Sequence, residues 1–88
     1  MVGRRVTFQA GWPRELGLPG DYCRVPQGVD PREDGCWYLI DPRGGAGAAL
    51  PSVHQVVQHD DGTITCTPSL VMPSGWHGFL EHGVWRPV

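Results

Sequence analysis

Two neighbouring stretches decide the fold: Asp61-Gly62-Thr63-Ile64-Thr65-Cys66-Thr67-Pro68-Ser69-Leu70 and Gly75-Trp76-His77-Gly78-Phe79-Leu80-Glu81-His82-Gly83-Val84-Trp85. The first opens on an Asp-Gly turn signal, after which three threonines alternate with Ile64 and Cys66. Alternation with a period of two is typical of a strand with one buried face. We expect pairing to stop at Pro68, because proline has no amide hydrogen to donate to a neighbouring strand.

The second stretch predicts a β-hairpin closed by a three-residue loop, Glu81-His82-Gly83, with the glycine in the left-handed conformation. In that register Leu80 faces Val84, and Phe79 faces Trp85. The second pair is an aromatic cross-strand contact, which stabilises a hairpin by roughly 0.2–1 kcal/mol relative to alanines. The C-terminal segment is therefore predicted to double back on itself as paired strands.

The faces of this hairpin carry candidate binding residues. If Phe79 and Trp85 face the core, then Trp76 and Arg86 face outward or into a groove, and Trp and Arg dominate binding hot spots. If the hairpin is turned the other way, His77 is the exposed side chain instead. Trp76 has a purely structural alternative, as a cap over the core of a small barrel.

Three earlier segments also read as short strands. Residues 5–9 alternate between polar and apolar side chains, which predicts a half-buried strand. Residues 21–25 predict a second strand, closed by the proline that follows. Residues 36–40, Cys-Trp-Tyr-Leu-Ile, are apolar at consecutive positions and follow an Asp-Gly turn signal. Such a short, aromatic and β-branched run predicts a central strand that is buried on both faces.

Two segments connect these strands to the hairpins. Residues 41–49 are rich in glycine and alanine and predict a flexible connection. In residues 52–59, Ser52 and Gln55 have the spacing of a helix capping box. Valines in the same segment disfavour a helix, because they lose side-chain freedom there, and the segment leads directly into a turn. We favour a strand that enters a hairpin over a helix.

The composition supports an all-β fold. Among 88 residues are 13 glycines and nine prolines without a Gly-X-Y repeat, which is typical of many turns and loops between short strands. We expect one small domain over residues 1–88: an antiparallel barrel or sandwich of about five to seven short strands. A core this small contributes only about 3–5 kcal/mol, which favours a homo-oligomer or a bound partner.

Charge and cysteine usage exclude several classes of function. The formal net charge is −2 and no lysine is present, so clustered positive charge for nucleic acid is missing. Three cysteines without a CxxC pair do not resemble a secreted disulfide framework. The sequence shows neither the apolar region of a signal peptide nor a membrane-spanning run. We therefore expect a cytoplasmic protein with no nucleic-acid or membrane partner.

Neither a metal nor a catalytic centre is predicted. The cysteines and histidines lack the short-range pairs of a zinc site, and we expect no cofactor. The residue types of a catalytic triad are present: Ser69 or Cys66 as the nucleophile, His77 as the base and Asp60 as the acid. No nucleophile elbow surrounds them, and Ser69 has the alternative of bonding backbone at its strand end. We therefore expect no enzyme and no catalytic residues, and retain Ser69, Trp76, His77 and Arg86 as candidate binding residues.

Four motifs near the C-terminus carry a resemblance: Asp61-Gly62-Thr63-Ile64-Thr65, Pro68-Ser69-Leu70, Trp76-His77-Gly78-Phe79-Leu80 and Gly83-Val84-Trp85. They resemble a family of small uncharacterised proteins common in tailed-phage genomes. Longer bacterial relatives of that family look like zinc-ribbon proteins, with an early cysteine knuckle and a cysteine before the late histidine. This chain lacks the knuckle and has Ser74-Gly75 before His77, so the resemblance implies phage or prophage origin and an accessory role without zinc.

These observations together predict a non-enzymatic binding protein of phage type. Its expected mode of action is contact with a protein of the host cell, for example to inhibit a host defence. One alternative is an oligomeric protein that binds or sequesters a small anionic ligand in a pocket formed by Trp76, His77 and Arg86. Another alternative is a minor component of the virion.

Overall fold

The computed structural model describes residues 1–8, 17–26, 28, 36–44, 47–50 and 54–88. This described part contains no helix, and therefore none that could span a bilayer. Its strands are, in chain order, β1 (Arg4–Arg5), β2 (Asp21–Arg24), β3 (Trp37–Ile40), β4 (Gly47–Ala49), β5 (Gln55–Gln58), β6 (Ile64–Val71), β7 (His77–Glu81) and β8 (Val84–Pro87). The all-β prediction is confirmed.

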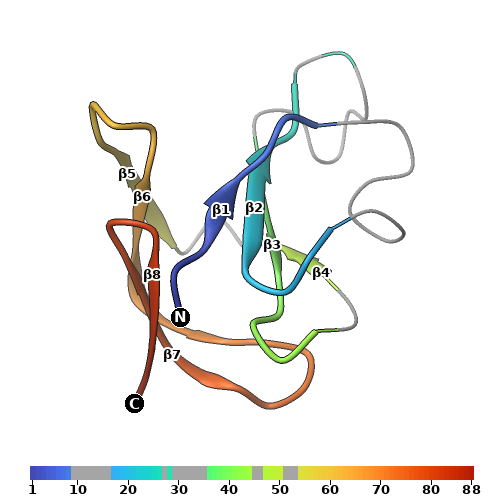
Figure 1. Ribbon diagram of the computed structural model, residues 1–88, viewed down its shortest axis with the longest axis vertical. Helices are drawn as coiled ribbons and strands as arrows, with labels where there is room; N and C mark the ends of the chain where they lie inside the picture. Colours follow the sequence, from blue (N-terminus) through green and yellow to red (C-terminus); the bar gives the residue numbers. More distant parts are fainter. Residues whose placement is uncertain (9–16, 27, 29–35, 45–46, 51–53) are drawn as a thin grey trace.

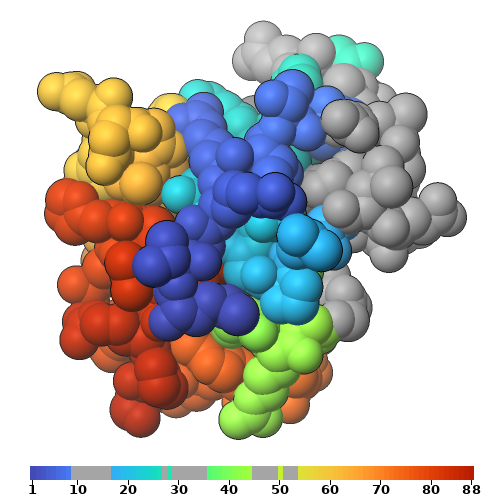
Figure 2. Space-filling view, viewed as in Figure 1, coloured from blue at the N-terminus to red at the C-terminus, as the bar shows by residue number. Residues whose placement is uncertain are grey.

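The strands form two four-stranded sheets rather than one closed barrel (Figure 1). Both sheets follow chain order, β1-β2-β3-β4 and β5-β6-β7-β8. β1 pairs with β2 in parallel, whereas all the other pairings among these strands are antiparallel. In Figure 2 the first residues of the chain lie across the boundary between the sheets. There Val2 forms a bridge to Val84 in β8, so the N-terminal segment runs along one edge of the second sheet.

Side chains from both sheets share one core. Every second residue of a strand points toward the opposite sheet, and these side chains pack against one another. This packing removes apolar area from water. The buried members of this cluster are Tyr22, Trp37, Leu39, Ile64, Cys66, Leu70, Met72, Trp76, Leu80 and Trp85.

β3 is buried on both faces, as its continuous apolar sequence predicts. Leu39 faces the main core. Ile40 packs with Cys23 in a second, smaller cluster, against which Val6 and Phe8 lie half-buried. β3 also lies between β2 and β4 in its sheet, so the prediction of a central strand is confirmed.

Several strand boundaries differ from the predictions. β1 is only two residues long and shares Arg5 alone with the predicted strand over residues 5–9, of which residue 9 lies outside the described residues; the Val6 amide still donates to the Tyr22 carbonyl. The predicted flexible connection contains β4, which pairs with β3. β5 confirms the strand within residues 52–59, of which 52 and 53 lie outside the described residues. β6 continues through Pro68 to Val71, because the irregular pairing with β7 between Cys66 and Leu70 does not require a proline amide.

The loop of the last hairpin has two residues, not the predicted three. His82 and Gly83 both have positive φ, 46° and 75°, as in the type I′ turn whose twist matches antiparallel strands. The register is therefore shifted by one residue: Leu80 pairs with Trp85, and Phe79 pairs with Arg86. The glycine is left-handed as predicted, but the predicted pairings are wrong.

The shifted register reverses which hairpin residues are buried. Leu80 and Trp85 face the core together, and Trp76 is also buried, with only 8% of its surface exposed. Phe79 and Arg86 lie on the opposite face of the sheet. The orientation in which His77 is exposed is the one observed.

Candidate functional site

Three of the four candidate binding residues share the solvent side of the second sheet. We define this outer face as the side of β5–β8 that points away from the shared core. It comprises Val57, Thr65, Thr67, Ser69, Val71, His77, Phe79, Glu81, Val84 and Arg86. The predicted residues Ser69, His77 and Arg86 belong to it, whereas Trp76 lies on the core side.

Ser69 and His77 are in direct contact on the outer face. The His77 Nε2 atom lies 3.0 Å from the Ser69 hydroxyl. The contact arises because Val71 pairs with His77 and the extra residues of β6 push Ser69 toward β7. The Nε2 atom of His54 lies 3.2 Å from the Ser69 carbonyl and so holds the same residue from the other side. Ser69 is thus fixed between two imidazoles.

This contact resembles the first half of a nucleophile–base pair. A catalytic pair also needs a group that orients the imidazole and donors that stabilise an oxyanion. Within the described residues no hydrogen bond or ion pair joins His77 to an acid, and Asp60 lies in the turn between β5 and β6. The arrangement supplies an exposed polar contact rather than an assembled catalytic centre.

Arg86 is engaged within the outer face. Its guanidinium forms an ion pair with Glu81 and lies 5.8 Å from the centre of the Phe79 ring. The expectation of a pocket formed by Trp76, His77 and Arg86 together is therefore not met, because Arg86 and Trp76 are on opposite faces of the sheet. The register shift is the cause of this difference.

Exposed valines surround these polar pairs. Val71 is 71% exposed, and Val57 is 56% exposed. The two charges of Glu81 and Arg86 cancel, and the Ser69 hydroxyl is already hydrogen-bonded to His77. The outer face therefore combines two exposed valines with threonines and paired polar groups, and it carries little net charge.

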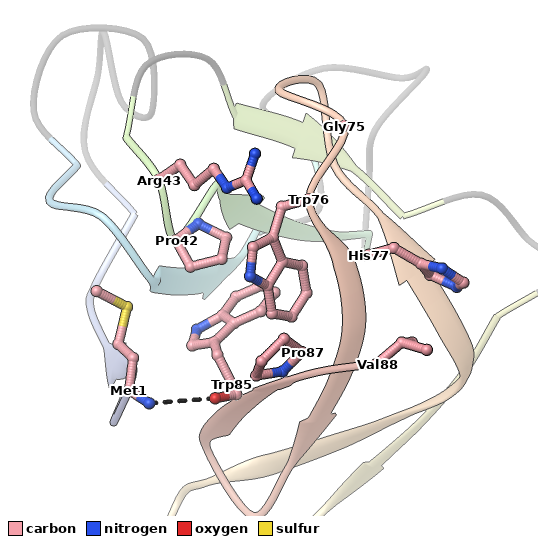
Figure 3. Close-up of a pocket in the computed structure, with 9 residues that line it drawn as sticks. All are labelled: Met1, Pro42, Arg43, Gly75, Trp76, His77, Trp85, Pro87 and Val88. Carbon is pink, nitrogen blue, oxygen red and sulfur yellow. Dashed lines mark hydrogen bonds between the residues drawn. The ribbon is translucent and has the colours of Figure 1, made fainter.

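Trp76 takes part in a different feature, an open pocket beside the core (Figure 3). Its volume is about 670 Å³. Trp76 and Trp85 meet edge to face there, with ring centres 5.4 Å apart. His77 borders the pocket, but its ring points away from the two indoles (Figure 3). The lining residues are Met1, Pro42, Arg43, Gly75, Trp76, His77, Trp85, Pro87 and Val88.

Arg43 and Pro42 are pocket residues that the sequence did not indicate. They belong to the segment predicted as a plain connection, and only the tertiary fold brings them to Trp76. The buried Asp41 does this by accepting hydrogen bonds from the amides of Arg43 and Ser74, each at 2.8 Å. Burial by itself raises the pKa of the Asp41 carboxyl, but hydrogen bonds from Ser74 and the Arg43 amide outweigh it and hold the pKa below its usual value.

Replacing Asp41 by asparagine should cost about 1–3 kcal/mol of unfolding free energy at pH 7, because an amide nitrogen would face a backbone donor. A depressed pKa means that the carboxylate stabilises the fold above the unfolded-state pKa and loses that effect as the pH falls through the folded-state pKa. The difference between the native protein and Asp41→Asn should therefore shrink below a pH of about 4. Urea unfolding of both proteins at several pH values measures this difference in unfolding free energy. A difference that stays constant with pH would contradict the proposed role of the Asp41 carboxylate.

Two of the three cysteine thiols are buried and are therefore expected to be unreactive. Cys23 and Cys66 are fully buried, and burial raises the pKa of each thiol to about 12. Cys36 is half-buried. We expect iodoacetamide to modify Cys36 alone in the native protein and all three cysteines in urea, as intact-mass measurement will show. Rapid modification of Cys66 in the native protein would contradict its placement in the core and would make it a candidate nucleophile again.

The remaining histidines form a stacked pair at the end of the second sheet. The rings of His59 and His82 are 3.8 Å apart and nearly parallel, and His59 Nε2 lies 2.7 Å from the Thr65 hydroxyl. Among the described residues no group of three or more His, Cys, Asp or Glu side chains converges as metal ligands would. The stack therefore tethers two turns to each other.

Comparison of the chain with models of protein families, with curated protein sequences and with solved structures finds no match. What the structure itself defines is an all-β protein of two four-stranded sheets with an open pocket. The resemblance to small tailed-phage proteins stays a prediction from the C-terminal motifs.

Proposed function

We propose that the protein is a binding protein that acts by contact with another protein through the outer face of β5–β8. The observation that carries this proposal is the combination of exposed valines with polar groups that are already paired. Burying such a surface gains apolar area, since Val71 and Val57 lie open to solvent. It leaves few unpaired polar groups behind, because Glu81 pairs with Arg86 and Ser69 with His77.

The chemistry of the outer face also describes the partner. A surface with cancelled charges favours a flat partner of low net charge, with an apolar centre opposite the valines. The phage-type motifs make a protein of the bacterial host the partner that we propose. Inhibition of a host process by occupation of such a surface requires no catalytic group on this chain.

A hydrolase is the second candidate, because Ser69 and His77 are within hydrogen-bond distance. If the pair were catalytic, Ser69→Ala would abolish hydrolysis of an activated ester such as p-nitrophenyl acetate, whereas His54→Ala would leave the reaction intact. We expect the native protein and both variants to be alike in this assay. A rate that depends on Ser69 would replace the binding proposal by a catalytic one.

The binding proposal is tested by capture from a lysate of the bacterial host, with Val71→Glu as the disrupting variant. Leu18→Glu is the matched control, since Leu18 is also an exposed apolar residue, at 57%, and is not on the outer face. The native protein and Leu18→Glu should retain one stoichiometric partner, and Val71→Glu should retain at least about tenfold less of it.

Two outcomes would overturn this proposal. One is the absence of a stoichiometric partner, or equal retention by Val71→Glu. The other is a dimer of the purified chain, detected by sedimentation equilibrium, that Val71→Glu dissociates, because the occupant of the outer face would then be a second copy.

A further inference from the structure

The pocket beside Trp76 is bordered by the Arg43 guanidinium, which donates to no acceptor in the described part of the chain. The Arg43 guanidinium forms no hydrogen bond or ion pair with any residue in the described part of the chain, although its charge contributes to lowering the pKa of the buried Asp41 carboxyl. By contrast, Arg4 pairs with Asp21, and Arg86 pairs with Glu81. The Arg43 guanidinium extends on the same side of the pocket as Trp76 (Figure 3). It is thus available to a ligand.

A second donor faces the same space. The indole N–H of Trp85 is used internally, since it donates to the Gly20 carbonyl at 2.9 Å. The indole N–H of Trp76 has no acceptor among the described residues. Its ring nitrogen points toward the side of the pocket where Pro42 and Arg43 lie (Figure 3). A guanidinium and an N–H therefore border one cavity without an acceptor of their own.

The rest of the lining combines flat apolar groups with polar ones, among which is His77. The edges of the two indoles, Pro42 and Pro87 supply flat hydrocarbon surface, and no aspartate or glutamate side chain lines the pocket. The volume of about 670 Å³ lies within the range of sites for small molecules. Such a lining accepts a planar apolar group and places a negative charge at one end.

We propose that this pocket binds a small planar aromatic carboxylate. The guanidinium of Arg43 matches the two oxygens of a carboxylate in a bidentate pair, and the Trp76 N–H adds a third hydrogen bond. The aromatic part of the ligand lies against Pro42, Pro87 and the indole edges. A phosphate ester carries more charge and more oxygens than one guanidinium and one N–H can satisfy, so the pocket favours a carboxylate over a nucleotide.

The two donors are held in place before any ligand arrives. Asp41 binds the Arg43 amide and the Ser74 amide, so the turn that carries Arg43 and the turn before Trp76 share one buried carboxylate. Ser74 in turn accepts a hydrogen bond from the Trp76 amide at 3.3 Å. Preorganised donors reduce the entropy cost of binding.

Phenylacetate is a suitable probe, and the indole N–H signals of the native protein report on it by nuclear magnetic resonance. We expect saturable shifts of the Trp76 Nε1–H signal, assigned with Trp76→Phe, and little change for Trp85. Phenylacetamide, which has the same shape without the charge, and acetate, which has no ring, should each bind at least about tenfold more weakly.

Two variants isolate the cation. Arg43→Gln should weaken phenylacetate binding at least about tenfold. Arg24→Gln removes the same charge at an exposed position of β2, away from the pocket and the outer face, and should leave binding unchanged. Absence of a saturable shift up to roughly 10 mM, where even a weak site fills, would overturn the proposal, as would equal binding of phenylacetamide. Tighter binding of AMP than of phenylacetate would overturn the carboxylate assignment. None of these results depends on the outer face.

Discussion

Replacement of Gly78 by alanine should lower the free energy of unfolding by about 3 kcal/mol or more, because backbone atoms stand where the methyl group would go. A Cβ at Gly78 would overlap the Arg86 carbonyl oxygen and lie 2.8 Å from Cα of Pro87, both in the paired strand β8. It would also lie 2.5 Å from the Trp76 ring. A domain of this length has roughly 4–13 kcal/mol in total, so the loss is a large share of its stability.

Gly75→Ala is the matched control for this prediction. Gly75 has φ of +88° and no atom within 4 Å of the added carbon. Its substitution costs only the backbone strain of a left-handed alanine, about 1 kcal/mol. Urea unfolding of both variants separates crowding from strain. Similar losses for Gly78→Ala and Gly75→Ala would show that Gly78 is not packed against β8 and the Trp76 ring as described.

Local patterns predicted the strands well because they depend on neighbouring residues. The alternation of Ile64 and Cys66 with threonines, and the continuous apolar run of β3, each give the observed burial. The predicted hairpin register is wrong because of a single residue: His82 adopts the left-handed conformation together with Gly83. Histidine at positive φ is uncommon, and nothing in the sequence distinguishes a two-residue loop from a three-residue loop here.

The candidate sites show the same division between local and tertiary information. The contact of Ser69 with His77 joins two residues that the sequence had already singled out, because both flank the β6–β7 turn. Arg43 could not be paired with Trp76 in advance. Their proximity depends on Asp41, whose burial follows from the packing of the first sheet on the second.

Trp85→Ala should be as damaging as Gly78→Ala, with a loss of about 3–5 kcal/mol. Trp85 is 1% exposed and is among the largest fully buried side chains of the described residues. Its removal opens a cavity under Trp76 and leaves the buried Gly20 carbonyl without its indole donor. The backbone amide of residue 85 still donates to the Met1 carbonyl in this variant, so the loss reports on the side chain.

Two variants divide this loss into its physical parts. Trp85→Phe keeps most of the ring but removes the N–H, so it should cost about 1–3 kcal/mol through the unsatisfied carbonyl of Gly20. Arg86→Ala, one residue along on the outer face, should cost at most about 1 kcal/mol, because its ion pair with Glu81 is exposed. From the most to the least stable, the expected order is therefore Arg86→Ala, Trp85→Phe and Trp85→Ala. The reverse order would place residue 86 in the core and residue 85 outside, which would contradict the observed orientation of β8.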